Sequence, residues 1–440
     1  MALFIRTHNR CPSAATALPL NARRLLLVAT VLAPFVAGAQ TVLPLTLQEA
    51  LALARTRSPQ LVAQTAAIGA AESLAASAGQ LPDPKLGIGI DNLPVNGPDR
   101  FSVGRDFMTM RKIGLMQEFP REEKRKLRGE RADADVKKEL ATLAVLMTTL
   151  RRDVADAWLN RYYAERQEAT LRELLPEMQL QIDIAQAQLK GGKGSASDLL
   201  AARASQAQTL DRIADAQRLI AKAKANLARW LGEAANRPLD SVPNTTTLSQ
   251  DPKMLVAGIE HHPELQVFAP LEAAAKVDIA LAQAAKKPDW SLEIAYAQRG
   301  SSFSNMVSVQ ARIDLPLWSG KRQDPVIAAK FKALEQVRAQ REEAQRMHEA
   351  EIKGMLVDWD SAKQRIVRYD KELMPLVRER TQATLAAYRG GRGGLMPLLE
   401  ARRQEIDTRM NLVAVQSELA KAWAQLNFLL SEQHGTRQAR

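Results

Sequence analysis

Cysteine is almost absent from this chain of 440 residues, whose single cysteine is Cys11. An intramolecular disulfide and a cysteine-based zinc site both need at least two cysteines, so the sequence excludes them. Histidine is also rare, and His261 and His262, being adjacent, point in different directions on a helix. No spacing of residues predicts a structural or catalytic zinc site. We therefore expect neither a bound metal nor a cofactor.

Long apolar runs are missing as well. The run from Leu25 to Val36 spans about 12 residues, which is too short to cross a bilayer as a helix. It follows four arginines with no acidic residue among them, and it precedes Ala37-Gly38-Ala39, as in a secretory signal. Cys11 lies upstream of the run, whereas an acylated cysteine would directly follow it. We predict a signal peptide at 1–39, cleaved near Ala39, and an exported protein that is not lipid-anchored.

Aromatic residues make up only 5% of the chain, and alanine, leucine, glutamine, arginine and glutamate dominate it. This composition is typical of long helices. The formal net charge of +12 raises the question of a nucleic-acid partner. The basic residues are interleaved with acidic ones, as in Arg121-Glu122-Glu123-Lys124-Arg125-Lys126, which is typical of a solvated helix face. We expect no nucleic-acid partner.

Motifs of catalysis are missing too. No set of serine, histidine and aspartate indicates a nucleophile. The glycines of Gly191–Gly194 follow a predicted helix, whereas a phosphate-binding loop follows a strand. Glu118, Glu122 and Glu123 fit favourable charges at the start of a helix better than an acid–base pair. We predict that the protein is not an enzyme.

The chain instead contains an internal duplication with an offset of about 200 residues. Glu173-Leu174-Leu175-Pro176 returns as Glu372-Leu373-Met374-Pro375, and Leu189–Gly194 returns as Tyr388–Gly393. A period this long is not that of a solenoid. It predicts two copies of one large unit.

The predicted copies, at 40–240 and 241–440, share one order of elements. Sustained heptad spacing predicts a long helix in each copy. Each long helix contains a proline near its far end, where we expect a kink. Every copy has an amphipathic helix, a strand pair, a long helix and a returning helix, which we place at about 46–78, 84–119, 121–190 and 197–230 in the first copy and at about 252–285, 289–316, 321–389 and 395–430 in the second.

The strand pairs alternate apolar residues with small or polar ones, as in Trp290-Ser291-Leu292-Glu293-Ile294. Alternation of this kind suits an amphipathic hairpin on a soluble core, but its length also suits a membrane strand, and the chain offers no other sheet to cover it. Strands in lipid must close into a barrel. Four strands per chain are too few, so two chains would supply eight and three would supply twelve, enough for a lumen.

Two strand pairs, two hairpins of long helices, two glycine-rich tips and one duplication together make this chain resemble the TolC-like outer-membrane factor family. The resemblance covers essentially the whole mature chain. Leu81-Pro82-Asp83-Pro84, Gly114–Pro120 and Leu373-Met374-Pro375 resemble more narrowly the heavy-metal efflux branch of that family.

The resemblance implies a mainly α fold with a membrane β-barrel portion. A homotrimer would join a TolC-like α-helical barrel to a twelve-stranded β-barrel in the outer membrane of a Gram-negative bacterium, in contact with its lipid. Such a protein is the passive, gated exit duct of a tripartite efflux system, here for heavy-metal cations. Its partners would be a periplasmic adaptor (membrane fusion protein) and a proton-driven, RND-type inner-membrane pump. The stretch at about 232–251 would form a belt around the tunnel.

Two alternatives stay open at this point. A duct for drugs or secreted polypeptides would have the same architecture. A periplasmic coiled-coil adaptor or a structural protein would belong to another class. An adaptor should contain one helical hairpin and compact β domains, whereas this chain predicts two hairpins with strand pairs.

The resemblance also implies which residues form the gate at the tunnel entrance. Asp198 and Tyr388 match family positions that hold the entrance shut, with Arg392 as a further partner. Glu400 matches a carboxylate of the constriction ring, whereas the other ring position is Pro397 here. The alternative for Asp198 is a simple N-cap of the returning helix. Threefold symmetry would turn even one carboxylate into a ring that favours cations.

The glycine clusters and the leucine pairs that follow them are the predicted adaptor-docking tips. Glycine allows the left-handed backbone that a sharp helix reversal requires. The second leucine of each pair could equally pack in the helix seam. The predicted docking residues are Gly191, Gly192, Gly194, Leu199 and Leu200 in the first copy and Gly390, Gly391, Gly393, Leu398 and Leu399 in the second.

Overall fold

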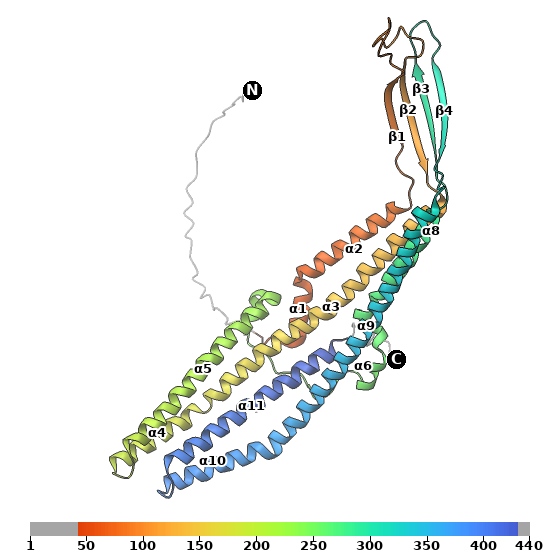
Figure 1. Cartoon of the computed structure of the whole chain (residues 1–440). Coiled ribbons are helices and arrows are strands. Elements are labelled where there is room, and N and C mark those ends of the chain that lie inside the picture. The colour runs from red at the N-terminus through yellow and green to blue at the C-terminus, as the bar shows by residue number, and fades with distance from the viewer. Residues whose placement is uncertain (1–42, 430–440) are drawn as a thin grey trace, which may run out of the picture. The chain divides into compact units, whose positions relative to one another are not determined.

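The structure, a computed structural model, describes residues 43–429, so the signal predicted at 1–39 lies outside the described residues (Figure 1). No helix within 43–429 is both long enough and apolar enough to cross a membrane. The elements, in chain order, are α1 (Leu47–Arg57), α2 (Pro59–Ala78), β1 (Lys85–Asp91), β2 (Met110–Phe119), α3 (Glu122–Arg172), α4 (Leu175–Lys190), α5 (Ala196–Leu231), the 3₁₀ turn η1 (Gly232–Asn236), α6 (Pro252–Ala257), the 3₁₀ turn η2 (Ile259–His261), α7 (Pro263–Gln266), α8 (Phe268–Ala284), β3 (Trp290–Gln298), β4 (Met306–Ile313), α9 (Ser319–Arg368), the π-helical turn η3 (Tyr369–Leu373), α10 (Met374–Arg389) and α11 (Leu395–Asn427).

Residues 43–429 are mainly helical with one small antiparallel sheet of four strands, which confirms the predicted mainly α class for this part of the chain. The strand order is β1-β2-β3-β4, so the two predicted hairpins join into a single sheet. The central pair, β2 and β3, runs in register from Arg111 opposite Gln298 to Phe119 opposite Trp290. Within the described chain, β1 and β4 are the edges of this sheet.

Two segments that the periodicity predicts as single helices are divided in the structure. The segment at about 46–78 forms α1 and α2, because Ser58 between them is extended at φ −69° and ψ 111°. A residue before proline disfavours the helical region, and Pro59 follows directly. The segment at about 252–285 forms α6, η2, α7 and α8, and His262 before Pro263 is likewise extended.

Both long helices are interrupted just before the prolines near their far ends. The helix predicted at about 121–190 ends as α3 at Arg172 and resumes as α4, with Pro176 in the first turn of α4. Its counterpart passes from α9 into the π-helical turn η3 before Pro375 in α10. Proline lacks an N–H and its ring clashes with the carbonyl four residues earlier, so a regular helix cannot continue through it.

The shorter helices pack along the long ones. α2 and α5 both pack on α3, while α8 and α11 both pack on α9, and α8 and α11 also contact α3 (Figure 1). The largest apolar core lies where α3, α5, α9 and α11 approach each other, and it includes the fully buried residues Trp158, Leu227 and Ile352 and the buried Leu419. This core joins the two helical hairpins into one unit.

Two tryptophans hold the irregular segment between η1 and α6 against the helices. The indole N–H of Trp359 in α9 donates to the carbonyl of Thr245 at 2.9 Å, and that of Trp423 in α11 donates to the carbonyl of Thr247 at 2.9 Å. A partly buried indole N–H needs an acceptor. The segment 237–251 is therefore anchored by its backbone although it forms no helix or strand.

Candidate functional site

The two tips, one between α4 and α5 and one between α10 and α11, have matching backbones. Gly192 and Gly391 take φ values of +68° and +67°, a left-handed region that side chains other than glycine rarely occupy. A Cβ at Gly194 would lie 3.1 Å from the Cβ of Gln188, and a Cβ at Gly393 would lie 3.2 Å from a Cβ in the last turn of α10. Each tip thus needs one glycine for its backbone conformation, and at the second glycine an added side chain would have to displace its neighbour by a few tenths of an ångström.

Asp198 takes part in a capping box at the start of α5. Its carboxylate accepts hydrogen bonds from the Ser195 N–H at 3.2 Å and hydroxyl at 2.8 Å, while the Asp198 N–H donates to the Ser195 hydroxyl oxygen at 3.1 Å. The N-cap is therefore Ser195, and Asp198 is the acidic third residue of the helix. This corrects the alternative in which Asp198 itself caps the helix.

Tyr388 is buried between the tips and is 3% exposed. Burial, and secondly the negative charge of Asp198, raise the pKa of its phenol, so the structure brings these two predicted gate residues into one neighbourhood. The phenol oxygen has no hydrogen-bond partner within residues 43–429. The amide of Gln188 in α4 donates to the Tyr388 carbonyl at 3.3 Å. One chain therefore joins its own two tips through this tyrosine.

An apolar cluster surrounds Tyr388 and draws on all four helices of the two tips. Its other buried members are Ile182, Ala185, Ala202, Leu395 and Leu398. Leu398 is fully buried there, so its side chain packs between the tips and presents no surface to a partner. Seam packing, predicted as the alternative for Leu200 and Leu399, does not fit Leu200, which is 64% exposed.

The other predicted gate residues do not join this cluster. Arg392 and Glu400 are exposed, as is Pro397. Neither Arg392 nor Glu400 forms an ion pair with any residue of the described chain. The structure therefore brings together Asp198 and Tyr388 and leaves Arg392 and Glu400 at the surface of the tips.

A buried ion-pair network lies near the tips, and none of its residues is among the gate or docking residues predicted from the sequence. Arg402 and Glu405 of α11 are 5% and 2% exposed, and their side chains are 2.9 Å apart. Arg409 approaches the other oxygen of Glu405 at 2.5 Å, and Arg402 also pairs with Glu177 of α4. The network links α4 to α11 and lines a cavity of about 220 Å³. The sequence did contain one indication of this network, because Arg402 stands at the position of the second copy that corresponds to Arg203 in the first.

Replacing Arg402 by methionine should destabilise the tip region, because Glu405 would lose one of the two cations that compensate its buried charge. Breaking a buried pair costs about 3–5 kcal/mol when one charge is left unpaired, and Arg409 should hold the cost near the lower end. Thermal unfolding of the detergent-solubilised protein measures the change. Arg203→Met is the matched control, because Arg203 is exposed, and it should change stability by less than about 0.5 kcal/mol. Equal melting of both variants would contradict a stabilising network.

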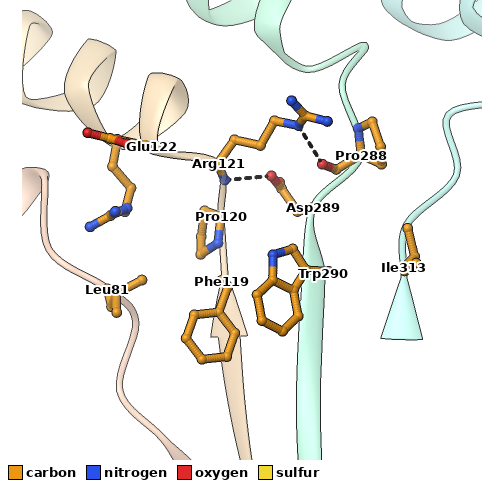
Figure 2. Close-up of a pocket in the computed structure, with 10 residues that line it drawn as sticks. Leu81, Phe119, Pro120, Arg121, Glu122, Pro288, Asp289, Trp290 and Ile313 are labelled. Atoms are coloured by element: carbon orange, nitrogen blue, oxygen red, sulfur yellow. Dashed lines mark hydrogen bonds between the residues drawn. The ribbon is translucent and has the colours of Figure 1, made fainter. Parts of the chain in front are cut away.

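The junction between helices and sheet is a second structured site, around a cavity of about 580 Å³ (Figure 2). Phe119 stacks on Trp290 with ring centroids 4.3 Å apart. The carboxylate of Asp289 accepts from the Arg121 N–H at 3.0 Å and from the Lys124 ammonium at 2.8 Å. Burial favours the neutral acid, but these hydrogen bonds outweigh it and lower the pKa of Asp289. The ends of β2 and β3 are thus fixed to the start of α3.

Comparison with known proteins places this geometry in a family. A family model described as outer membrane efflux protein matches residues 50–233 and 256–432, which is most of the chain. Among curated proteins, no sequence matches the chain.

Several solved structures share the fold. The outer-membrane channel OprN is 18% identical with a TM-score of 0.73, and the match covers 87% of this chain and 89% of that one. The outer membrane protein VceC from Vibrio cholerae is 17% identical with a TM-score of 0.72, covering 87% and 95%. CusC is 19% identical with a TM-score of 0.71, covering 88% and 92%. The chain belongs to the outer membrane efflux protein family, a family of transport channels rather than of enzymes.

Proposed function

We propose that this protein is the outer-membrane exit duct of a tripartite efflux system and that it works as a homotrimer with a twelve-stranded barrel. The observation that carries the proposal is the division of the sheet into an apolar face and a polar face. Across the four strands, Ile88, Ile113, Tyr296 and Val307 stand in one row of paired residues. Leu86, Leu115, Ile294 and Val309 stand in a second row on the same face.

These apolar rows are open to the surroundings. Ile88 is 78% exposed and Val307 is 70% exposed. No helix of the described chain packs extensively on the sheet, and β1 and β4 leave two unpaired edges. Apolar residues in alternation, with no protein to cover them, suit lipid. Edges in lipid must be paired, and further copies of the same sheet would pair them.

The opposite face is polar, as a lumen requires. Lys112 and Arg312 pair with the two oxygens of Glu293, each at 2.7 Å. The positions between these charges are small, with Gly114 opposite Ala295. Outer-membrane barrels alternate apolar residues toward lipid with polar residues toward the interior. The charged residues therefore favour an arrangement in which this face borders the water-filled interior of the barrel.

We further propose that the two tips dock on a periplasmic adaptor linked to an RND-type pump and that they form the gate. The exposed Leu200 and the open space around Gly192 and Gly391 support docking. The proximity of Asp198 to Tyr388 supports a link that holds the entrance shut. In a trimer, Arg392 and Glu400 would face neighbouring copies or the axis. The matching backbones of the tips also support a duplication, with repeats at 40–240 and 241–440.

The proposed cargo is a heavy-metal cation, and its support is sequence-based. Leu81-Pro82-Asp83-Pro84 and Gly114–Pro120 resemble the heavy-metal efflux branch. A duct for drugs or secreted polypeptides is the alternative, because selection can reside in the pump.

A deletion strain tests the cargo. Loss of the duct should sensitise cells to one or more of zinc, cobalt, cadmium, copper and silver, and the plasmid-borne gene should restore growth. A panel of hydrophobic drugs on the same plates serves as the comparison. Sensitivity to drugs alone would overturn the metal assignment while leaving the duct in place, and the absence of any sensitivity would count against an efflux role in that strain.

A further inference from the structure

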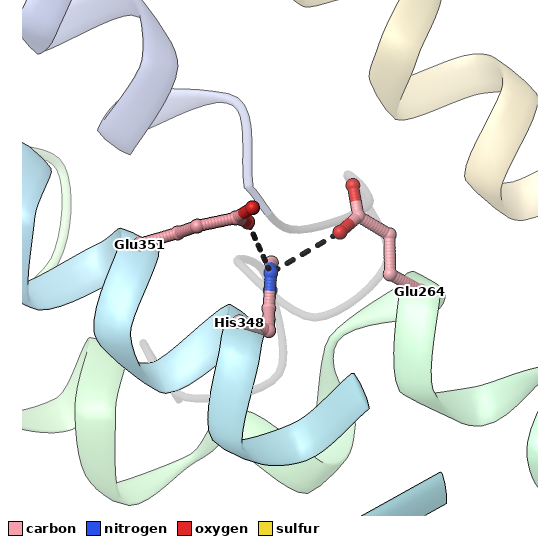
Figure 3. A group of neighbouring side chains, drawn as sticks. All are labelled: Glu264, His348 and Glu351. Carbon is pink, nitrogen blue, oxygen red and sulfur yellow. Dashed lines mark ion pairs between the residues drawn. The ribbon is translucent and has the colours of Figure 1, made fainter. Parts of the chain in front are cut away.

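Two buried histidines from distant parts of the chain meet beside α9. His348 of α9 is 3% exposed and His262, just before α7, is 1% exposed. Nε2 of His348 lies 2.9 Å from Nδ1 of His262, so this nitrogen has a partner. The other nitrogen of His348, Nδ1, faces two carboxylates, with Oε2 of Glu264 at 3.1 Å and Oε2 of Glu351 at 3.6 Å (Figure 3).

Nδ1 of His348 nevertheless has no hydrogen-bond partner within the described chain. The Glu264 oxygen is close enough to Nδ1 for a hydrogen bond, so the angle between the two groups is what prevents one. A buried imidazole nitrogen with one carboxylate oxygen off its axis and a second oxygen at 3.6 Å, beyond hydrogen-bond distance, is left uncompensated. A cation on the axis of the Nδ1 lone pair, with an oxygen on either side, would satisfy all three atoms at once.

The elements hold these three groups in a ligand-like arrangement. His348 and Glu351 are three residues apart, so they share one face of α9. Glu264 comes from α7, and its second oxygen, Oε1, is held by Arg152 of α3 at 2.6 Å, which leaves Oε2 to face the histidine. The three ligand atoms all lie within 4.8 Å of one another. Tetrahedral bonds of about 2.0–2.2 Å to nitrogen and oxygen place neighbouring ligands roughly 3.3 Å apart, between the two distances seen at Nδ1.

The partner of His348 fits the same interpretation. Metal-bound histidines donate their other ring N–H to a fixed acceptor, which sets the tautomer that leaves a lone pair for the metal. Here Nε2 of His348 faces Nδ1 of the buried His262. The expectation that the sequence holds no zinc site rested on residues close together in the chain, whereas these ligands come from two different helices.

We propose that His348, Glu264 and Glu351 bind a divalent transition-metal cation of the Zn²⁺ class. One imidazole and two carboxylates without a thiolate suit this class, and three protein ligands leave a fourth position to water. The cation would fix α7 to α9, and Arg152 already ties α7 to α3. The site would hold helices together and is separate from the exported cargo, so it stands or falls independently of the proposed transport role.

Zinc content tests the site. The full-length protein, purified in detergent and stripped with a chelator, is dialysed against Zn²⁺ and its zinc is measured by mass spectrometry. We expect one zinc per chain and an increased melting temperature. Glu351→Gln removes a direct ligand, so it should weaken binding at least as much as the roughly 10- to 100-fold that loss of an outer-shell partner costs. Co²⁺ in place of Zn²⁺ should give a tetrahedral visible spectrum that this variant loses. Glu351 is half exposed, so its replacement should not disturb folding.

Glu349→Gln is the matched control. Glu349 lies on the same helix and pairs with Lys353 at 2.6 Å, so its loss should leave zinc content, melting and spectrum unchanged. His348→Gln should abolish binding. Failure of the wild-type protein to hold zinc, retention of zinc by Glu351→Gln, or equal loss in Glu349→Gln would each overturn the proposal in favour of a simple ion pair between His348 and Glu264. Metal or drug sensitivity of the deletion strain would be unaffected by any of these results.

Discussion

Val309→Arg should abolish assembly of the protein in the outer membrane, whereas Ser308→Arg should leave it intact. The two residues are adjacent in β4 and lie at the same depth, but they face opposite sides of the sheet. Val309 is 67% exposed and belongs to the apolar rows, opposite Ile294. Arginine toward lipid costs about 2–4 kcal/mol at the bilayer midplane, and a trimer would incur that cost three times.

Ser308 lies on the polar face, opposite Ala295. An arginine there would project toward water and toward the charged group around Glu293, so its cost should be small. Outer-membrane fractions run on gels with and without heating report assembly, because a folded trimer migrates as a compact species until it is boiled. If both variants assemble equally, the face that contains Val309 does not contact lipid. If only Ser308→Arg fails to assemble, the face that contains Ser308 is the one that contacts lipid.

The alternation of residues was enough to predict the strands but not how they pair. Period-two spacing places Ile294 and Tyr296 on one face whatever the partner is. The pairing of β2 with β3 places Phe119 opposite Trp290, although the two residues are far apart in the sequence, and it leaves no local trace there. It depends on the helices α3 and α8 bringing both strand ends to one junction.

Only the helix breaks near the far ends of the two long helices were predicted. Pro176 and Pro375 stand at equivalent positions, and both helices are interrupted there. Ser58-Pro59 and His262-Pro263 also divide helices, although apolar periodicity continues through them. The steric rule for a residue before proline outweighs periodicity at such points.

The candidate site was predictable in its backbone and less so in its side chains. Glycine spacing identifies the tips, because few other residues adopt the conformation of Gly192 and Gly391. The burial of Arg402, in contrast with the exposed Arg203, could not be read from two equivalent positions. Burial depends on which helix packs against each position. Glu177 of α4 pairs with Arg402 in the second copy and forms no such pair with Arg203 in the first.

Large side chains at the tips should abolish export while leaving folded trimers. A Cβ at Gly192 or Gly391 would meet nothing within 4 Å, so a side chain there points away from the protein into the space that a docked adaptor would fill. The double variant Gly192→Trp/Gly391→Trp should therefore lose export completely. Resistance of the complemented deletion strain to the proposed cargo measures export, and cross-linking to the proposed adaptor measures docking.

The matched control is Gly192→Ala/Gly391→Ala. Alanine imposes the same left-handed strain at φ +68° and +67°, of about 1–2 kcal/mol per residue, but adds a single carbon. If docking is the function of the tips, the alanine variant should retain most export and cross-linking, and both variants should show the wild-type trimer on unheated gels. Equal loss in both would assign the defect to backbone strain, and full export by the tryptophan variant would remove the tips from adaptor docking. The two variants share the backbone strain and differ only in the size of the side chain. A defect that appears only with tryptophan therefore indicates that a partner contacts the tips, whereas a defect in both variants indicates that the turn itself is disturbed.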